Sequence, residues 1–558
     1  MTDPIATAAD WRRHDPDPVT RAELGALIDS ARAGDPDAFA ELASRFTGPL
    51  EFGTAGLRGQ VGAGQSRMNT AVVIRATAGL AAYLRDRVGP DARVVLGCDA
   101  RNGSAQFFDA AAEVLSGTGL TVLALPKRLP TPVTAFAVRA TGADAGVMIT
   151  ASHNPAADNG YKVYLGGRAT DADGCGAQIV GPTDAQIAAL IAAAPPADEV
   201  PRSATGIVDL GAELLDAYLD RVAGYRRDPG PSPVRVVLTA MHGVGGAPAL
   251  EALRRARVPD VRVVAEQFEP DPEFPTVGFP NPEEPGALDR ALTLAARVGA
   301  DLVIALDPDA DRCSAAVPDA DGRWRQLSGD QIGALLGEQA AADSSRTGDA
   351  LACSVVSSTL LAKIAAAHGL ASAVTLTGFK WIARTPGLRF GYEEAIGYCT
   401  DPEAVRDKDG IGAMLRLVTL VEGLGGRGLR PTDLLDELAR AHGLHATAAV
   451  SLRFDDTAEI AATMARLRAA AVPELAGAAV VDREDLTQPG SGLPATDALI
   501  YRTDAGDRVI VRPSGTEPKL KCYLEVVLGC RDGTVPHAAA ADRLALLEAE
   551  VRALLERR

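Results

Sequence analysis

The segment VVIRATAGLAAYLRDRVGPDARVVLGCD, Val72–Asp99, contains one helix and one strand in succession. Its first part, residues 72–88, has apolar side chains at helical spacing. Its last part, residues 92–99, is a short apolar run that leads into a polar loop. A helix followed by a short buried strand and a polar loop is the unit from which parallel sheets flanked by helices are built. The segment therefore predicts an α/β domain.

The same alternation returns further along the chain. It appears in VRVVLTAMHGVGG (Val234–Gly246), in ADLVIALDPDADR (Ala300–Arg312) and in ALACSVVSSTLLAKIAAAHGL (Ala350–Leu370). The C-terminal part differs, because its strands TAAVSLRF, RVIVRPSG and LKCYLEVVLG alternate and are followed by helix, which is typical of an α+β domain. The expected fold class is therefore α/β, with three similar α/β domains and a C-terminal α+β domain.

The domain boundaries are expected where the composition changes. Pro- and Ala-rich joints near 193–206, the segment near 318–330 and the stretch near 425–445 separate the units. Residues 1–48 predict a polar-faced helical extension ahead of the first α/β domain. The predicted domains are 1–208 (extension and domain I), 209–325 (domain II), 326–440 (domain III) and 441–558 (domain IV).

Composition limits the possible functions. The chain has 558 residues, of which 47% are hydrophobic and 23% are charged, as in a globular protein. A net charge of −17 argues against nucleic-acid binding but allows a small anionic substrate in a locally basic cleft. Seven cysteines without a CxxC pair indicate neither a zinc site nor a disulfide framework. There is no signal-like N-terminus and no apolar run of ~18 residues, so we expect a cytoplasmic protein without membrane contact.

The first chemically distinctive loop follows the apolar run AGVMIT. Its sequence TASHNP (150–155) favours a turn that projects Ser152 outward, with Lys162 ten residues beyond. A capping serine would be the structural alternative. No GxSxG motif surrounds Ser152, and an adjacent histidine is poorly placed as the base of a triad, so a serine hydrolase is disfavoured.

The second loop, LDPDADR, places Asp307, Asp309 and Asp311 directly after the apolar run DLVIAL, with Arg312 beside them. Three alternating carboxylates converge only if a positive charge compensates their repulsion, and a divalent cation that prefers oxygen ligands does so. A solvated acidic turn is the alternative. The EF-hand pattern is excluded, because the sixth position is Arg312 and the twelfth is Pro318.

Two further loops carry polar groups suited to a phosphorylated sugar. RPSGTEPKLKCY offers a guanidinium, two hydroxyls and a glycine backbone, a combination that binds phosphate, although a plain β-turn is possible. GYEEAIGY (391–398) offers paired carboxylates, which accept hydrogen bonds from sugar hydroxyls or form simple surface charge. Together the four loops indicate phosphoryl transfer to a hydroxylated substrate.

The motifs TASHNP (150–155), DPDADR (307–312), EEAIG (393–397) and RPSGTEP (512–518) resemble those of the α-D-phosphohexomutase superfamily in order and spacing. Further stretches, EFGTAGLRG (51–59), MHGVGG (241–246), FPTVGFPNPEEPGAL (274–288), LTGFKWI (376–382) and RDKDG (406–410), are similar to the branch of large phosphoglucomutases and phosphopentomutases. The resemblance covers nearly the whole chain. It implies four domains around a central cleft, with one loop from each domain.

The resemblance also implies the roles of individual residues. Ser152 would carry a phosphate and, with Asp307, Asp309 and Asp311, would bind one Mg²⁺ per subunit. Arg58 and Arg312 match cleft arginines, and His153 would position or polarise the phosphoserine. Lys162 and Lys408 both match lysines near the reacting hydroxyl, and either could be the general base.

The substrate side of the site follows in the same way. The non-reacting phosphate would be bound by the last loop, and the sugar by the loops of domain III; the residues expected there are Arg512, Ser514, Gly515, Thr516, Thr377, Gly378, Lys380, Glu393 and Glu394. A sugar 1,6-bisphosphate would be both the intermediate and the activator. The resemblance leaves monomer and dimer open.

One position departs from the glucose-preferring pattern. Where those relatives read GEES, this chain has Tyr392-Glu393-Glu394-Ala395, so a methyl group replaces a hydroxyl. The expected activity is the interconversion of hexose 1- and 6-phosphates (glucose, then mannose), with pentose 1- and 5-phosphates as the alternative. Two other interpretations are less well supported. A phosphatase with an aspartate nucleophile would need neither TASHNP nor RPSGTEP, and the chain has both. A non-catalytic protein that binds sugar phosphates would not need Ser152, the three aspartates and both lysines, and the chain has all of them.

Overall fold

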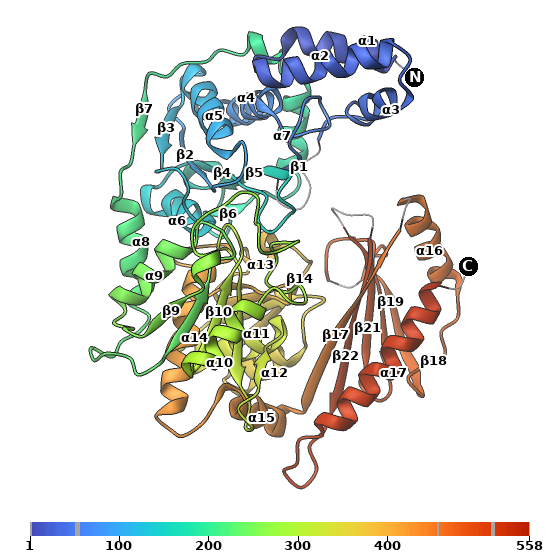
Figure 1. The fold of residues 1–558 in the computed structure, drawn as a ribbon. Helices are drawn as coiled ribbons and strands as arrows, with labels where there is room; N and C mark the ends of the chain where they lie inside the picture. The colour runs from blue at the N-terminus through green and yellow to red at the C-terminus, as the bar shows by residue number, and fades with distance from the viewer. Residues whose placement is uncertain (1–2, 51–55, 455–456, 491, 515–518, 557–558) are drawn as a thin grey trace. The chain divides into compact units, whose positions relative to one another are not determined.

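The computed structural model describes residues 3–50, 56–454, 457–490, 492–514 and 519–556 (Figure 1). The chain divides into two compact units: residues 1–327 with 396–422, and residues 328–395 with 423–558. Within the described residues, no helix is long and apolar enough to span a bilayer.

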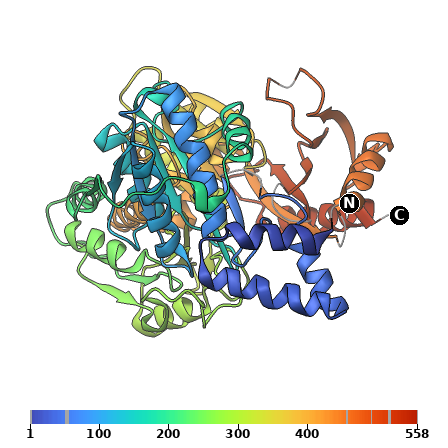
Figure 2. The same ribbon diagram turned by 90° about the horizontal axis from the view of Figure 1, so that it is seen from above.

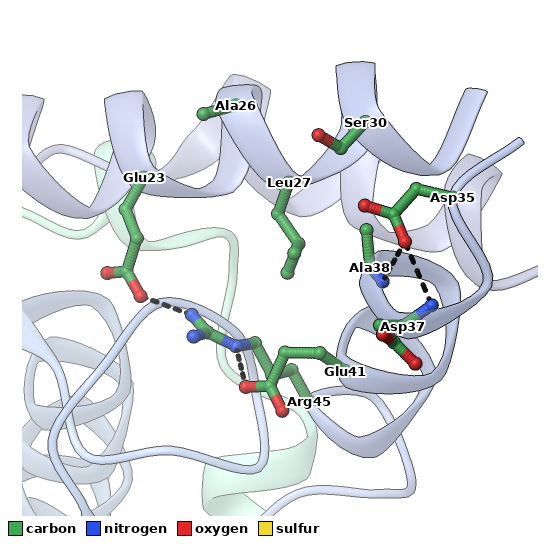
Figure 3. Close-up of a pocket in the computed structure, with 9 residues that line it drawn as sticks. All are labelled: Glu23, Ala26, Leu27, Ser30, Asp35, Asp37, Ala38, Glu41 and Arg45. Atoms are coloured by element: carbon green, nitrogen blue, oxygen red, sulfur yellow. Dashed lines mark hydrogen bonds and ion pairs between the residues drawn. The ribbon is translucent and has the colours of Figure 1, made fainter. Parts of the chain in front are cut away.

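Three helices open the first unit, and each begins at an Asp-Pro pair. They are α1 (Pro4–His14), α2 (Pro18–Arg32) and α3 (Pro36–Ser44), with Asp3, Asp17 and Asp35 as N-caps. Aspartate accepts hydrogen bonds from the first free amides, and proline suits the first helical position. The three helices share a small apolar core that includes Leu24 and Leu42, and Figure 2 shows them packed beside one another. The predicted helical extension is confirmed.

Domain I follows as a sheet with helices on its faces. Its strand order is β1-β5-β4-β2-β3-β7, and β6 also pairs with β5. Strands β4, β2, β3 and β7 are parallel, with β7 at the edge, whereas β1 and β5 are antiparallel additions at the other side. The strands are β1 (Leu57–Gln60), β2 (Arg93–Cys98), β3 (Thr121–Ala124), β4 (Ala145–Ile149), β5 (Asp158–Leu165), β6 (Ala177–Gln178) and β7 (Ile207–Asp209); the helices are α4 (Thr70–Arg87), α5 (Ser104–Gly117), α6 (Thr131–Thr141) and α7 (Thr183–Ala192). The helix and strand predicted from the opening segment are therefore α4 and β2.

Domain II has a five-stranded sheet in the same unit, in the order β12-β11-β10-β8-β9. Strands β10, β8 and β9 are parallel, and the hairpin of β11 and β12 adds antiparallel strands beside β10. The strands are β8 (Val236–Thr239), β9 (Val261–Val263), β10 (Leu302–Leu306), β11 (Cys313–Pro318) and β12 (Trp324–Gln326); the helices are α8 (Glu213–Ala223), α9 (Gly246–Arg255) and α10 (Asp289–Val298). The short strand β16 (Gly397–Cys399) and the start of α14 (Gly410–Gly425) also belong to this unit.

The second unit combines a parallel sheet with an antiparallel one. In the first, β13 (Ala350–Ser354) lies between β14 (Ala371–Thr375) and β15 (Leu388–Glu393). The second has the order β17-β22-β21-β20-β19-β18 and is antiparallel throughout. Its strands are β17 (Leu444–Arg453), β18 (Glu474–Leu475), β19 (Ala478–Asp485), β20 (Leu499–Thr503), β21 (Arg508–Pro513) and β22 (Lys519–Leu528); the helices of the unit are α11 (Gly329–Ala342), α12 (Leu360–Ala367), α13 (Phe379–Ile382), α15 (Pro431–His442), α16 (Thr457–Ala469) and α17 (His537–Glu556).

Each face of the antiparallel sheet carries buried apolar side chains within this unit. Val509 and Val511 of β21 share an apolar core with α16 and α17 (Figure 1). Ile510, which points to the opposite face because strand side chains alternate, packs with Val355 and Val356 beyond β13. Glu525 of β22 fixes the same junction through polar contacts.

Glu525 is a buried carboxylate with several donors around it. It accepts hydrogen bonds from the Ser358 hydroxyl (2.8 Å) and the Thr359 amide (2.8 Å), and it pairs with His445 (3.0 Å) and Arg508 (3.0 Å). Burial raises the pKa of Glu525, but the hydrogen bond from His445 and the charge of Arg508 outweigh it and bring the pKa to about 2. The carboxylate therefore stabilises the junction only in its charged form.

Glu525→Gln is expected to lower the free energy of unfolding of this unit by about 3 kcal/mol at pH 7, since it leaves buried donors poorly paired. A carboxyl group whose pKa is lowered on folding stabilises the folded state fully at a pH above its pKa in the unfolded chain, which is 4.5 for Glu525. This stabilisation is lost as the pH falls toward 2, so wild type and variant should converge over that window. Denaturant unfolding of a form in which Trp11 and Trp324 are replaced by Phe, so that Trp381 of this unit is the fluorescent tryptophan, measures the difference.

Glu484→Gln, which weakens a half-buried pair with Arg502 in the same sheet, is the matched control and should cost less than about 1 kcal/mol, because solvent still reaches both groups. Equal losses in the two variants, or a difference that stayed constant down to pH 3, would contradict the assignment.

Candidate active site

The Ser152 loop begins where β4 ends and turns sharply. Ser152 has a φ of +52°, in the left-handed region that non-glycine residues rarely adopt, and its amide donates to the Thr150 hydroxyl (2.8 Å). The side chain is only 2% exposed, and its Oγ lies 2.8 Å from Oδ2 of Asp307. The predicted turn is therefore confirmed, but the prediction that Ser152 projects outward is wrong, because the loop directs it toward the carboxylates that follow β10.

The acidic loop gathers its carboxylates as the sequence predicts. Asp307, Asp309 and Asp311 are all fully buried, and one oxygen of each lies within 4.8 Å of the others. The turn is closed by the amide of Ala310, which donates to the Asp307 carbonyl (2.8 Å). In the part of the chain that the structure describes, Oδ1 of Asp309 and Oδ1 of Asp311 receive no hydrogen bond. Buried carboxylate oxygens without donors, in a group of three, are suited to bind a hard divalent cation.

The MHGVGG segment packs directly against this loop. The amide of Val244 donates to the Pro308 carbonyl (2.8 Å). A Cβ at Gly243 would lie 2.3 Å from Cα of Pro308, so only glycine allows this approach. The segment after β8 therefore fixes the backbone of the acidic loop after β10.

Two lysines lie on the acidic triplet. Nζ of Lys162, from β5, is 2.8 Å from Asp309 and 2.9 Å from Asp311. Nζ of Lys408, from the loop before α14, is 3.1 Å from Asp311. The structure therefore brings together both lysines predicted from the sequence, on a shared carboxylate.

The charges in this cluster determine one another. Burial raises the pKa of Asp307, and the neighbouring carboxylates raise it further. Burial also raises the pKa of Asp309 and of Asp311, but the positive charge of Lys162 outweighs it and brings both pKa values below the usual one. At Asp311, Lys408 adds to this lowering. Burial alone would lower the pKa of Lys162, yet the two carboxylates raise it above its ordinary value. Lys162 therefore keeps its proton and its positive charge as long as both aspartates face it.

The remaining cationic residues surround the serine loop. Arg58, on β1, donates to the Asn154 side chain (2.9 Å), and Arg312 lies 3.8 Å from Asp311. Nδ1 of His153 is 3.3 Å from the Ser152 hydroxyl. Burial and the positive charges of Arg312 and Arg58 lower the pKa of His153 well below its usual value, so its imidazole is neutral at pH 7.

The second unit gathers the sugar-binding candidates at the carboxyl ends of its parallel strands. Thr377, Gly378 and Lys380 follow β14, whereas Glu393 ends β15 and Glu394 follows it. The Gly378 amide donates to Glu393 (2.7 Å) at a φ of +109°. Glu394 accepts from Ser354 (3.0 Å), the last residue of β13, and from Ser357 (3.3 Å), which follows that strand. These hydrogen bonds hold both carboxylates in fixed positions at one sheet edge.

The phosphate loop lies in the hairpin of β21 and β22. Arg512 pairs with Lys521 in the sheet register, and the Ser514 amide donates to the Lys519 carbonyl (2.8 Å). Gly515 and Thr516 lie outside the described residues. The structure thus places Arg512 and Ser514 in the second unit, whereas Ser152, the acidic triplet and both lysines are in the first.

Comparison with known proteins identifies the family. Models of phosphoglucomutase/phosphomannomutase domains I, II and III, and of the C-terminal domain, match residues 49–194, 216–322, 328–442 and 458–529. The chain belongs to the phosphoglucomutase/phosphomannomutase family. It is therefore an α-D-phosphohexomutase superfamily member with three α/β/α domains and a C-terminal domain, and an enzyme of the phosphosugar mutase class.

Individual relatives agree on this class but differ in their substrates. The chain is 44% identical to a "probable phosphomannomutase" of Haemophilus influenzae over 82% of this chain and 93% of the relative. It is 34% identical to a phosphopentomutase of Mus musculus over 93% of this chain and 89% of the relative. A crystal structure of parafusin, a phosphoglucomutase from Paramecium, matches with a TM-score of 0.68 at 19% identity, over 92% and 97% of the chains, and supports the fold.

Two residues at the candidate site were missed by the sequence reasoning. Thr131, at the start of α6, donates its hydroxyl to Asp309 (2.6 Å) and its amide to the Asp309 carbonyl (2.9 Å). Arg101 follows β2 and contacts the Ser152 loop. Arg101 follows β2, which pairs with the strand β4 that leads into Ser152, and Thr131 lies beyond β3, the next parallel strand of the same sheet. Their position after the carboxyl ends of parallel strands was a signal that could have been used.

Proposed function

We propose that this enzyme interconverts hexose 1-phosphates and hexose 6-phosphates, glucose first and mannose second, through phosphorylated Ser152 and a hexose 1,6-bisphosphate. The observation that carries the proposal is the Ser152 hydroxyl, 2.8 Å from Asp307 in a buried triplet of carboxylates. A hydroxyl in this position can receive and return a phosphoryl group away from bulk water.

A single Mg²⁺ fits this triplet. Asp307, Asp309 and Asp311 would hold it together with the oxygen of Ser152, because two of the carboxylates have oxygens without hydrogen bonds. When bound, Mg²⁺ would withdraw charge from the transferring phosphoryl group.

The residues of the chain itself supply the remaining chemistry. Arg58 and Arg312 provide fixed positive charge for the phosphoryl oxygens, and neutral His153 can donate or accept a hydrogen bond at Ser152. Lys162 and Lys408 are the two candidates for proton exchange with the sugar hydroxyl. Because Lys162 is charged while both aspartates face it, it can donate a proton and can take one only after it has lost its own. Both lysines approach Asp311, so the geometry favours neither as the general base.

The second unit would recognise the substrate. Glu393 and Glu394 are held in place and can accept hydrogen bonds from sugar hydroxyls, next to Thr377, Gly378 and Lys380. We assign the non-reacting phosphate to Arg512, Ser514, Gly515 and Thr516. The bisphosphate would reverse its orientation between the two transfers, so the same groups must accept either phosphate.

A phosphopentomutase is the second candidate, and Ala395 is the observation that favours it. Its methyl group cannot supply the hydrogen bond that a serine offers in glucose-preferring relatives, and several relatives are named for pentose phosphates.

The four domain ranges, 1–208, 209–325, 326–440 and 441–558, remain part of the proposal. Seven unpaired cysteines agree with a reducing cytoplasm.

Steady-state assays with glucose 1-phosphate, mannose 1-phosphate and ribose 1-phosphate, each with a bisphosphate activator, test the substrate. We expect kcat/KM to be highest for glucose 1-phosphate. Ala395→Ser should raise the glucose-to-ribose ratio of kcat/KM by about fivefold, because one added hydrogen bond contributes ~1 kcal/mol. A preference for ribose 1-phosphate above about tenfold, which is ~1.4 kcal/mol in transition-state binding, would replace the hexose assignment by the pentose one.

A further inference from the structure

Arg101 holds the backbone of the Ser152 loop. Its guanidinium donates to four carbonyl groups of this loop: those of Ser152 (2.6 Å), Asn154 (2.5 Å), Pro155 (2.8 Å) and Asp158 (3.1 Å). The loop closes back on itself between β4 and β5, so its carbonyls converge on one side. A single planar group of donors thus satisfies the inner face of the turn.

The side chain of Arg101 is itself fixed on its other sides. The residue is 4% exposed, and its Nε lies 3.6 Å from Asp99, which is 2% exposed. The ring of Phe274 covers the guanidinium at 5.0 Å. Asp99 accepts in turn from the Arg101 amide (2.9 Å) and the Ser104 hydroxyl (2.6 Å). Contacts that start from the end of β2 and the start of α5 therefore hold the Arg101 side chain against the Ser152 loop.

The contact to Ser152 acts on a strained residue. The φ of +52° at Ser152 costs free energy that surrounding contacts must offset. The donor at the Ser152 carbonyl and the Thr150 hydroxyl at its amide fix the two ends of this residue. With both ends fixed, Oγ points at Asp307, 2.8 Å away.

We propose that Arg101 is a positioning residue for phosphoryl transfer: it holds Ser152 in the left-handed conformation that aims its hydroxyl at the acidic triplet. Arg101 contacts the backbone of the loop and makes no hydrogen bond to a carboxylate of the triplet among the described residues. Lysine cannot replace it, because an ammonium group has no planar fork and cannot reach four carbonyls together. The inference rests on the proposed function, since it concerns the step that loads Ser152.

The test measures the phosphorylation of Ser152 separately from the complete mutase reaction. Dephosphorylated wild-type protein and Arg101→Lys are mixed with glucose 1,6-bisphosphate, quenched at intervals and analysed by intact mass and by peptide mapping of residue 152. We expect the rate of phosphorylation to fall about 100-fold in the variant, because displacement of a nucleophile by ~1 Å costs that much. The KM for sugar phosphate should change less than about threefold.

Arg226→Lys is the matched control. Arg226 is also buried in the first unit and donates to three carbonyl groups, those of Asp228, Gly230 and Ala256, but it pairs with Glu422 away from the Ser152 loop. It should lower the melting temperature about as much as Arg101→Lys and leave the phosphorylation rate within about twofold of wild type.

Asp99→Asn provides a second variant that keeps Arg101 but loosens it. We expect a phosphorylation rate lowered about tenfold, and this variant decides the question if Arg101→Lys does not fold. Rates at the wild-type level in both folded variants, or an equal loss in Arg226→Lys, would overturn the positioning role alone. Absence of phosphate on Ser152 in the wild-type protein would overturn the proposed function and this inference with it.

Discussion

Ser152→Ala is expected to abolish mutase activity and to leave the protein without a phosphoryl group after incubation with a sugar bisphosphate. The physical reason is that Oγ of Ser152 is the hydroxyl aimed at the acidic triplet, 2.8 Å from Asp307. Loss of a nucleophile that acts together with its partners lowers the rate by about 10⁴-fold or more. Intact mass should show a phosphorylated fraction in wild type and none in the variant.

Ser314→Ala is the matched control for this experiment. Ser314 is also fully buried, on β11, where its hydroxyl accepts from Gln326 (3.0 Å). It should retain phosphorylation and activity near wild type. Undiminished turnover in Ser152→Ala, or phosphate that remains on the protein and maps to another residue, would show that Ser152 is not the carrier.

Two identical stretches of sequence show how far the site could be predicted. Pro-Asp-Ala-Asp occurs at 308–311 and again at 318–321. The first copy follows β10, which lies inside the sheet, and its aspartates are fully buried. The second forms the turn of the hairpin of β11 and β12, where Asp321 is exposed and pairs with Arg323. An apolar strand precedes each copy, β10 the first and β11 the second, so the local sequence alone does not distinguish a buried acidic loop from an exposed hairpin turn.

Contacts between parts of the chain that are distant in sequence could not be predicted from the sequence alone. The Ser152 hydroxyl contacts Asp307, which is 155 residues away in the sequence, and Lys162 contacts Asp311, which is 149 residues away. Periodicity predicts which strands exist, but side-chain direction at their ends depends on the register between them. This is why Ser152 was expected outward and why the four carbonyl contacts of Arg101 were not foreseen. The local elements, such as α4 and β2, follow from patterns within a few residues and were correctly predicted.

Removal of divalent cations is expected to abolish activity, and Mg²⁺ is expected to restore it. The reason is the pair of buried oxygens, Oδ1 of Asp309 and Oδ1 of Asp311, that lack hydrogen-bond donors among the described residues. A cation at this site contributes several kcal/mol to the stabilisation of the transferring charge, so its loss should lower kcat by about 10³-fold. Mg²⁺ should also raise the melting temperature of the dephosphorylated protein, because it binds only the folded triplet.

Asp309→Ala should reproduce the effect of chelation in the presence of Mg²⁺ and should abolish the shift in melting temperature. The variant loses one cation ligand, together with the contacts of Asp309 to Lys162 and Thr131. Asp321→Asn, in the second Pro-Asp-Ala-Asp copy, is the control with the same local sequence; it should keep both the activity and the Mg²⁺-dependent shift, because its carboxylate is exposed and paired with Arg323. Full activity of wild type after exhaustive chelation, or an unchanged Mg²⁺ shift in Asp309→Ala, would exclude a catalytic cation on the triplet. The two readouts separate the causes of a loss, since a purely structural defect at Asp309 would lower the melting temperature while leaving its dependence on Mg²⁺ intact.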